Sequence, residues 1–349
     1  MIRELIEKIE AEKDLMQSEA SALMQELLGG RVAEAEIVSL LTTLRDKGAS
    51  VEELIGFASV MRGKARERLE EGGVDVDALR GEAELLDTCG TGGDGRGTFN
   101  VSTAAAIVAA AAGARVAKHG NRSISSRSGS ADVLEALGVR LDLPLERIPQ
   151  CLEEVGLVFL FAPRLHLAMK HVQGARRKLK TKTVFNLLGP LTNPLGATAQ
   201  LLGVYEPQLA EMMAQALAGL GSRRALVVAG ADGTDEVSTA GGTKLCELRD
   251  GQVSTREIAP EEFGLSRTSP DSLQGGDPSA NAEQMREILG GRSGPLRDWV
   301  LANTSAALVA VGKAKDFRGG VAMAAEAIDS GRAREKLEAL MAFTRKHAV

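Results

Sequence analysis

The feature that most constrains this chain is the alternation of short apolar runs with helical segments after residue 80. Runs such as "ELLDT", "ARVAKHG" and "RALVVAG" are typical of buried strands, and "VSTAAAIVAAAAG" and "EMMAQALAGLG" between them are typical of helices. Strands that alternate with helices through short connections form a largely parallel sheet covered by those helices. We therefore predict an α/β domain over residues 76–349, with a mostly parallel central sheet flanked by helices.

Residues 1–75 show no strand pattern, and their apolar side chains recur at helical spacing. Ser50 stands three residues before Glu53, which is the spacing of a capping box at the start of a helix. Glycines at 29–30, 48 and 72–73 end the helical patterns. We predict a small N-terminal helical domain over this stretch.

Two later stretches are expected to be connections. "NLLGPLTNP", residues 186–194, contains two prolines and a glycine and is predicted to be a hinge between the helical and α/β parts. Residues 266–281 are rich in Ser, Pro and Gly. They are either a flexible excursion or a boundary, and the sequence leaves both readings open.

Composition excludes several classes of protein. The 349 residues carry a net charge of −5 and only 3% aromatic residues, which argues against a general nucleic-acid or membrane-surface binder. No apolar run reaches the length of about 20 residues that a membrane span needs. Three widely spaced cysteines, Cys89, Cys151 and Cys246, are expected to be reduced thiols. We expect a cytoplasmic protein without a signal peptide.

A glycine-rich segment, "GTGGDGRGTFNVST", begins at Gly90 and contains the pattern G-x-G-x-x-G. A dinucleotide site is disfavoured, because the helix opens only near Ser102 and no acid follows about 20 residues on. The Walker A pattern also fails. Glycine amides and a helix N-terminus still favour an anion, whereas Asp94 would repel a bare phosphate. A phosphorylated sugar with Mg²⁺ would accommodate Asp94; a plain glycine-rich turn capped by Asp94 is the alternative.

A basic loop follows the next predicted strand, in "KHGNRSISSRSGS". It carries Lys118, Arg122 and Arg127 among serines, and its following helix is expected to be capped at or near Ser130. Loops at the carboxyl ends of parallel strands are where open α/β sheets bind ligands. Two such loops together indicate a site for a polyanion, with an ordinary solvated loop as the alternative.

At this point the sequence resembles the anthranilate phosphoribosyltransferase family. The resemblance rests on "GTGGDGRGTFNVSTAAA", "KHGNRSISSRSGSADVLEALG", "RKLKTKTVFNLLGPLTNP" and "DGTDEVS", in matching order and spacing over essentially the whole chain. It implies transfer of phosphoribosyl from phosphoribosyl pyrophosphate (PRPP) to anthranilate, with release of pyrophosphate, in tryptophan biosynthesis. It also implies a homodimer formed through the helical domain, to which residues from about 170 to 195 would contribute.

The resemblance also implies the site residues. Anthranilate would contact Gly90, Asn121 and Arg176, and Mg²⁺, as two ions of which one arrives with PRPP, would be held by Ser102, Asp235 and Glu236. The implied PRPP-binding residues are Gly90, Gly93, Asp94, Thr98, Asn100, Val101, Ser102, Thr103, Lys118, His119, Gly120, Asn121, Arg122, Ser123, Ser125, Ser126 and Ser130.

The residues themselves are compatible with this chemistry. Asp235 and Glu236 follow a predicted strand, and two carboxylates with substrate phosphates are a usual way to hold Mg²⁺, although adjacent acids in a turn are often only solvated. The lone pair of an aromatic amine suffices as nucleophile, so no dedicated base is required, and we identify none. His119 is taken as the only histidine in a candidate site, with a packing role as plausible as acid–base work.

The segment around Arg176 departs from the family pattern. Leu167 and Gly174 stand where the family usually has proline, and Lys182 stands where it commonly has arginine. These differences put the rigidity of the anthranilate pocket in question. Arg177, Lys178, Lys180 and Lys182 are interpreted as solvated, and His166 and His171 are five residues apart, which disfavours a zinc pair.

Two other functions stay open from the sequence. A pyrimidine-nucleoside phosphorylase-like enzyme would share the fold and use inorganic phosphate, without need of the Asp235–Glu236 pair. A non-catalytic nucleic-acid-binding relative is the second alternative, and the net charge of −5 argues against it.

Overall fold

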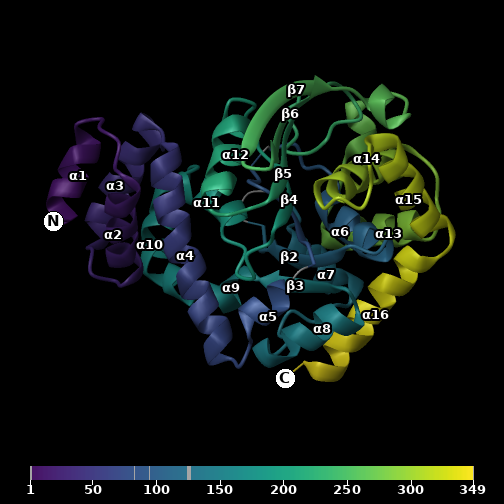
Figure 1. The fold of residues 1–349 in the computed structure, drawn as a ribbon, viewed down its shortest axis with the longest axis horizontal. Helices are drawn as coiled ribbons and strands as arrows, with labels where there is room; N and C mark the ends of the chain where they lie inside the picture. The colour runs from purple at the N-terminus through teal and green to yellow at the C-terminus, as the bar shows by residue number, and fades with distance from the viewer. Residues whose placement is uncertain (1, 82, 94, 124–126, 349) are drawn as a thin grey trace.

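The computed structural model describes residues 2–81, 83–93, 95–123 and 127–348, so the predicted site residues Asp94, Ser125 and Ser126 lie outside the described residues. A helical part at the N-terminal end stands beside a larger α/β part (Figure 1). The helical part begins with α1 (Ile2–Glu10), α2 (Gln17–Leu28), α3 (Glu34–Lys47) and α4 (Val51–Glu71). As predicted, Gly29, Gly48 and Gly72 are the C-caps of α2, α3 and α4.

The α/β part is built on a seven-stranded sheet in the order β3-β2-β1-β4-β5-β6-β7. Its strands are β1 (Leu85–Gly90), β2 (Arg115–Gly120), β3 (Leu157–Phe161), β4 (Ala199–Gly203), β5 (Arg224–Gly230), β6 (Thr243–Arg249) and β7 (Gln252–Ile258). The pairings from β3 to β5 are parallel, and β5–β6 and β6–β7 are antiparallel. The predicted fold class, with a mostly parallel sheet, is confirmed.

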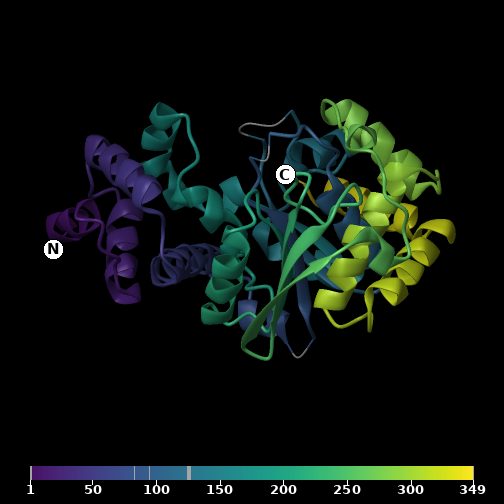
Figure 2. The same cartoon turned by 90° about the horizontal axis from the view of Figure 1, so that it is seen from above.

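Helices cover the sheet, as Figure 2 shows from above. After the short α5 (Val76–Arg80) come α6 (Val101–Ala111), α7 (Ser130–Leu137), α8 (Ile148–Glu154), α9 (Ala162–Leu165), α10 (Lys170–Leu179), α11 (Val184–Leu191) and α12 (Leu209–Gly219); the last are α13 (Pro278–Leu289), α14 (Pro295–Ala310), α15 (Phe317–Asp329) and α16 (Arg332–His347). Buried apolar side chains of α6, α14, α15 and α16 share one core with one side of the sheet. A second core joins α2, α3 and α4 to α11, α12 and the other side of the sheet.

The chain returns to the helical part after β3. There α10 packs against α2 and α3, and α11 packs against α4 and α12. These contacts support the proposal that residues from about 170 to 195 belong with the helical domain 1–75. Residues 186–191, predicted as part of a hinge, lie within α11, which includes Pro190, so the connection to β4 is only 192–198.

Residues 266–281 neither form a free excursion nor mark a boundary. The N–H of Phe99 donates to the carbonyl of Leu273 over 3.1 Å, and that of Gly275 donates to the carbonyl of Gly97 over 3.1 Å. Thr98 forms a β-bridge with Gln274. Residues 273–275 are therefore hydrogen-bonded to the end of the glycine-rich loop and hold it in place.

The cysteines and the lengths of the helices can also be compared with the sequence predictions. Cys89, Cys151 and Cys246 are free thiols. Among the described helices, none is long and apolar enough to cross a membrane.

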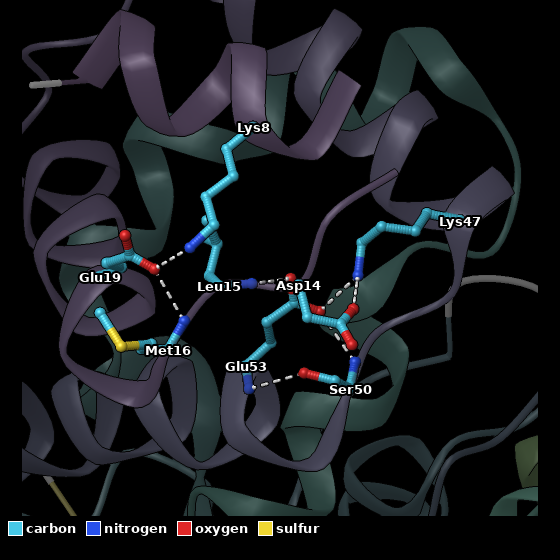
Figure 3. Close-up of polar contacts among 8 residues, drawn as sticks. All are labelled: Lys8, Asp14, Leu15, Met16, Glu19, Lys47, Ser50 and Glu53. Carbon is cyan, nitrogen blue, oxygen red and sulfur yellow. Dashed lines mark hydrogen bonds and ion pairs between the residues drawn. The ribbon is translucent and has the colours of Figure 1, made fainter. Parts of the chain in front are cut away.

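The helical part is organised around a buried carboxylate, drawn in Figure 3. Glu53 is fully buried, and its carboxylate accepts hydrogen bonds from the N–H groups of Leu15 (3.0 Å) and Ser50 (2.8 Å). Lys47 donates to it over 2.9 Å and to Asp14 over 2.6 Å. Burial acts to lower the pKa of Lys47, but these two carboxylates outweigh it and the pKa is raised. The predicted capping box thus also fixes the α1–α2 connection.

We expect Glu53→Gln to lower the free energy of unfolding of the helical part by about 3 kcal/mol, because it removes the buried ion-pair partner of Lys47 and leaves it paired with the exposed Asp14. Denaturant unfolding followed by circular dichroism measures this. Glu52→Gln, at the neighbouring exposed position, is the matched control and should change stability little. Equal stability of the two variants would contradict this role for Glu53.

Candidate functional site

The glycine-rich loop and the acidic doublet meet at the carboxyl edge of the sheet. Gly90 ends β1 and pairs in register with Gly203, which ends β4. Asp235, in the turn after β5, accepts a hydrogen bond from the N–H of Gly92 over 2.8 Å at Oδ2. A Cβ at Gly203 would lie 1.5 Å from the carbonyl oxygen of Asp235, and one at Gly90 would lie 2.5 Å from its Oδ2. Asp235 can therefore lie this close to the ends of β1 and β4 only because both strands end in glycine.

A buried lysine reaches this edge from β2. The ammonium of Lys118 donates to the carbonyl of Thr88 and lies 3.4 Å from the hydroxyl of Ser102 in α6. Lys118 is only 3% exposed, and burial lowers its pKa against the attraction of Asp87 and Glu236. A cation with so little water around it interacts strongly with any anion that enters the edge.

The first turn of α6 is less open than the sequence indicated. The helix begins at Val101, in agreement with the expected start near Ser102. The side chains of Val101 and Thr103 are 1% exposed. Their N–H groups donate to the carbonyls of Phe99 (2.7 Å) and Asn100 (3.1 Å). Any contact of these two N–H groups with a phosphate would have to compete with those bonds.

Asn100, predicted to hold phosphate, joins three segments of the structure. Its amide donates to the carbonyl of Ser128 over 3.0 Å, and its Oδ1 accepts from the hydroxyl of Ser128 (3.0 Å) and the amide of Asn281 (2.8 Å). The glycine-rich loop, the basic loop and α13 are thereby held together. Thr98 lies in the same loop, at its bridge with Gln274. Neither Asn281 nor Gln274 was expected at the site, because isolated polar residues give no sequence signal.

The basic loop is held by its own acids. Arg122 forms ion pairs with Asp132 (3.0 Å) and Glu135 (2.8 Å), which raise the pKa of its guanidinium. The N–H of Ser123 donates to Asp132 over 3.0 Å. These contacts give Arg122 a structural partner on α7, so it is a weaker candidate for phosphate binding than Lys118.

The base of the same loop is closely packed. Gly129 caps α7 and Ser130 is its first residue, in agreement with the cap expected at or near Ser130. The hydroxyl of Ser130 donates to the carbonyl of Asn121 over 3.3 Å. A Cβ at Gly120 would lie 2.3 Å from Ser130 Oγ, so this strand end also requires glycine.

Asp87 is a buried carboxylate that the sequence reading missed. Its Oδ1 accepts the N–H of His119 over 3.0 Å, and its Oδ2 accepts the amide of Asn193 over 2.8 Å. Asn193 also donates to the carbonyl of Ala117 over 2.8 Å. Burial raises the pKa of Asp87, whereas Lys118 and these donors act to lower it. An acid in the middle of the apolar run "ELLDT" was the available signal.

Two histidines meet beside this cluster, so the interpretation of His119 as the only histidine in the site is wrong. Nε2 of His119 lies 3.2 Å from Nε2 of His166, which comes from the turn after α9. Burial lowers the pKa of both rings, that of His166 to about 4. The pair is therefore neutral at physiological pH, and one ring donates to the other. His171 lies apart, on α10 beside Gly30.

Arg176 lies on α10, with its guanidinium carbon 5.2 Å from the centre of the Phe185 ring. Burial lowers its pKa. The guanidinium is thus partly removed from water and supported by an aromatic face, which suits it to a planar carboxylate.

The interpretation of Lys182 as solvated is wrong. It lies between α10 and α11, is half-buried, and its ammonium is 3.3 Å from the centre of the Tyr205 ring. Lys178 pairs with Glu34 over 2.7 Å, and Lys180 is exposed. The cation on Lys182 therefore faces the α/β part.

The donor set at the edge suits Mg²⁺. The described residues contain no group of three or more His, Cys, Asp and Glu side chains arranged for a metal. Asp235 and its neighbour Glu236 supply hard oxygen donors beside the amides of the glycine loop. Mg²⁺ is commonly held by one or two carboxylates together with phosphates of the substrate. The residues therefore fit an ion that is shared with a phosphorylated ligand.

Comparisons with known proteins agree with this geometry. A family model described as the α/β domain of a glycosyl transferase family matches residues 82–334, and its helical bundle counterpart matches residues 3–65. The fold and the site thus define a glycosyl transferase with a helical bundle and an α/β domain.

Comparison with individual proteins identifies the family within this class of glycosyl transferases. Anthranilate phosphoribosyltransferase of Anaeromyxobacter sp. (strain K) is 52% identical over 99% of this chain and 99% of that protein. The structure of the Thermus thermophilus enzyme of that name has a TM-score of 0.88 and 43% identity, and covers 98% of this chain and 99% of its own. The structure of the Saccharomyces cerevisiae enzyme in complex with PRPP and Mg has a TM-score of 0.85 and 28% identity, and it covers 99% of this chain and 98% of its own. The chain belongs to the anthranilate phosphoribosyltransferase family.

The lowered pKa of His166 predicts a pH-dependent stability. Since folding keeps the ring neutral down to about pH 4 instead of the ordinary 6.5, the unfolded chain binds this proton more readily. Stability is therefore lost as pH falls from 6.5 to 4, by on the order of 3 kcal/mol from this group. His166→Gln should remove that part of the slope, measured by denaturant unfolding at several pH values. His171→Gln, at an exposed histidine, is the control; parallel slopes for wild type and His166→Gln would refute the prediction.

Proposed function

We propose that this chain transfers phosphoribosyl from PRPP to the amine of anthranilate, releases pyrophosphate, and serves tryptophan biosynthesis. The observation that carries the proposal is the contact of Asp235 with Gly92 next to Lys118 and Ser102, which gathers acids, amides and a buried cation at one sheet edge. Relatives that are about half identical over nearly the whole chain support the particular reaction.

PRPP is assigned to the glycine-rich and basic loops. Gly90, Gly93 and Lys118 are the principal described residues for it, with Ser102 beside the lysine. Asp235 and Glu236 would hold the metal that PRPP brings, with a second ion as a further proposal. Mg²⁺, when bound, neutralises charge on the departing pyrophosphate. The loop amides and Lys118 add fixed positive potential there, so they favour departure from the ribose C1.

Anthranilate is assigned to the side that faces the helical part. Arg176 would bind its carboxylate, and Asn121 and Gly90 would orient the amine toward C1. Because the amine lone pair attacks without prior deprotonation, positioning carries most of the rate. The His119–His166 pair is neutral at pH 7, so it offers hydrogen bonds rather than charge to the acceptor.

Two further parts of the proposal concern the whole protein. We propose a homodimer through the helical domain, as the resemblance to the family implies. We also propose a cytoplasmic location, which the free thiols favour.

The direct test is turnover. With Mg²⁺ and PRPP, the purified protein should consume anthranilate, followed as loss of anthranilate fluorescence against a reaction without PRPP. Nucleoside phosphorolysis with inorganic phosphate, in place of that loss, would support the pyrimidine-nucleoside phosphorylase alternative. Salt-sensitive DNA binding without any turnover would support the non-catalytic one.

The acidic doublet provides a sharper test. Asp235→Ala with Glu236→Ala should reduce turnover at limiting Mg²⁺ by at least about a hundredfold, because the ion loses its protein ligands. Excess Mg²⁺ should restore part of the activity. Glu206→Gln, an exposed acid shortly after β4, is the matched control. Activity of the double variant equal to that of the control at limiting Mg²⁺ would remove the metal assignment.

A further inference from the structure

Lys182 connects the helical side of the molecule to the glycine-rich loop. It follows α10, which packs against α2 and α3, and precedes α11, which packs against α4. Its ammonium lies over the ring of Tyr205, 3.3 Å from the centre, and its Cε is 3.0 Å from the point that a Cβ at Gly93 would occupy. A cation carried by the helical part is thus held beside the loop assigned to PRPP.

Tyr205 and the loop form one unit. The N–H of Tyr205 donates to the hydroxyl of Thr91 over 3.1 Å, and the N–H of Thr91 donates to the carbonyl of Gly203 over 2.9 Å. The ring that carries the ammonium is therefore fixed to the start of the glycine loop. Asp235 contacts the same loop at Gly92. The short stretch 90–93 accordingly has a carboxylate of the α/β part bonded to it, and the side chain of a lysine from the helical side lies beside it.

The geometry at Gly93 leaves the cation within reach of an incoming anion. Gly93 has φ +75°, a conformation that favours glycine, and the missing side chain leaves the space that Lys182 occupies. A cation on an aromatic face is held by at most a modest attraction, and a phosphate oxygen is a stronger partner. Four rotatable bonds let the ammonium leave the ring without moving the backbone.

We propose that Lys182 binds the diphosphate group of PRPP, so that the helical side supplies a cation to the phosphoribosyl site. This inference rests on the proposed function. The ring of Tyr205 holds the ammonium next to the loop. When the diphosphate arrives with Mg²⁺, Lys182 turns from the ring to its oxygens. As a compact point charge, it adds to the metal and Lys118 in neutralising the leaving group.

The test compares Lys182→Met, which keeps the length and removes the charge, with Lys182→Arg, which keeps the charge. Binding of PRPP in the presence of Mg²⁺ is measured by isothermal titration calorimetry, and the KM of each substrate is measured separately. Lys182→Met should weaken PRPP binding roughly tenfold and should raise the KM for PRPP by a similar factor. The KM for anthranilate should stay within about twofold of the wild-type value. Lys182→Arg should stay within about threefold for PRPP.

Lys180→Met, two residues away at an exposed position, is the matched control for loss of one positive charge. PRPP affinity equal in Lys182→Met, Lys180→Met and wild type would overturn the proposal. Tyr205→Leu removes the ring but leaves the ammonium, and should not weaken PRPP binding. A loss as large as that of Lys182→Met would show that Lys182 acts only by packing. Wild-type turnover of anthranilate tests the proposed function separately.

Discussion

The site depends on one close approach, that of Asp235 to the ends of β1 and β4. Gly90 and Gly203 are register partners in adjacent parallel strands, and neither has a side chain to obstruct the turn after β5. A methyl group at Gly203 would overlap the backbone of that turn, which a shift of side chains cannot relieve. The acid therefore lies against the glycine loop because two strand ends lack side chains. This constraint brings the glycine-rich loop and the Asp235 turn, which are far apart in the sequence, together at one edge of the sheet.

A second constraint sets the position of the basic strand end. Asp87 is fully buried, and it fixes both the backbone of His119 and the side chain of Asn193. Removing a buried carboxylate from such donors leaves several polar groups unsatisfied, so its position is strongly determined. Lys118 precedes His119 in β2 and has the same carboxylate as an electrostatic partner. Asp87 therefore helps to position both the ammonium of Lys118 and the connection that contains Asn193.

The sequence predicted the fold better than the details of the site. Strand and helix alternation follows from burial on a parallel sheet, which apolar runs record directly. The strand Gln252–Ile258 escaped detection because "QVSTREI" is an edge strand with mostly exposed side chains. Long-range partners were also invisible: Asn281 contacts Asn100, and His166 meets His119, only because the tertiary structure joins distant segments. Short polar motifs indicate candidate binding residues, but not which of them the fold uses for internal contacts.

The two parts of the molecule are coupled by packing rather than joined by a free linker. Apolar side chains of α2, α3 and α4 form one core with α11, α12 and one side of the sheet. The connection 192–198 is short, and Asn193 within it is bound to Asp87 and Ala117. His166, after α9, contacts His119 at the end of β2 at the same place, so the segment that leads back to the helical part is also bound to the sheet. Large movement of the helical part against the sheet would disrupt this shared apolar core.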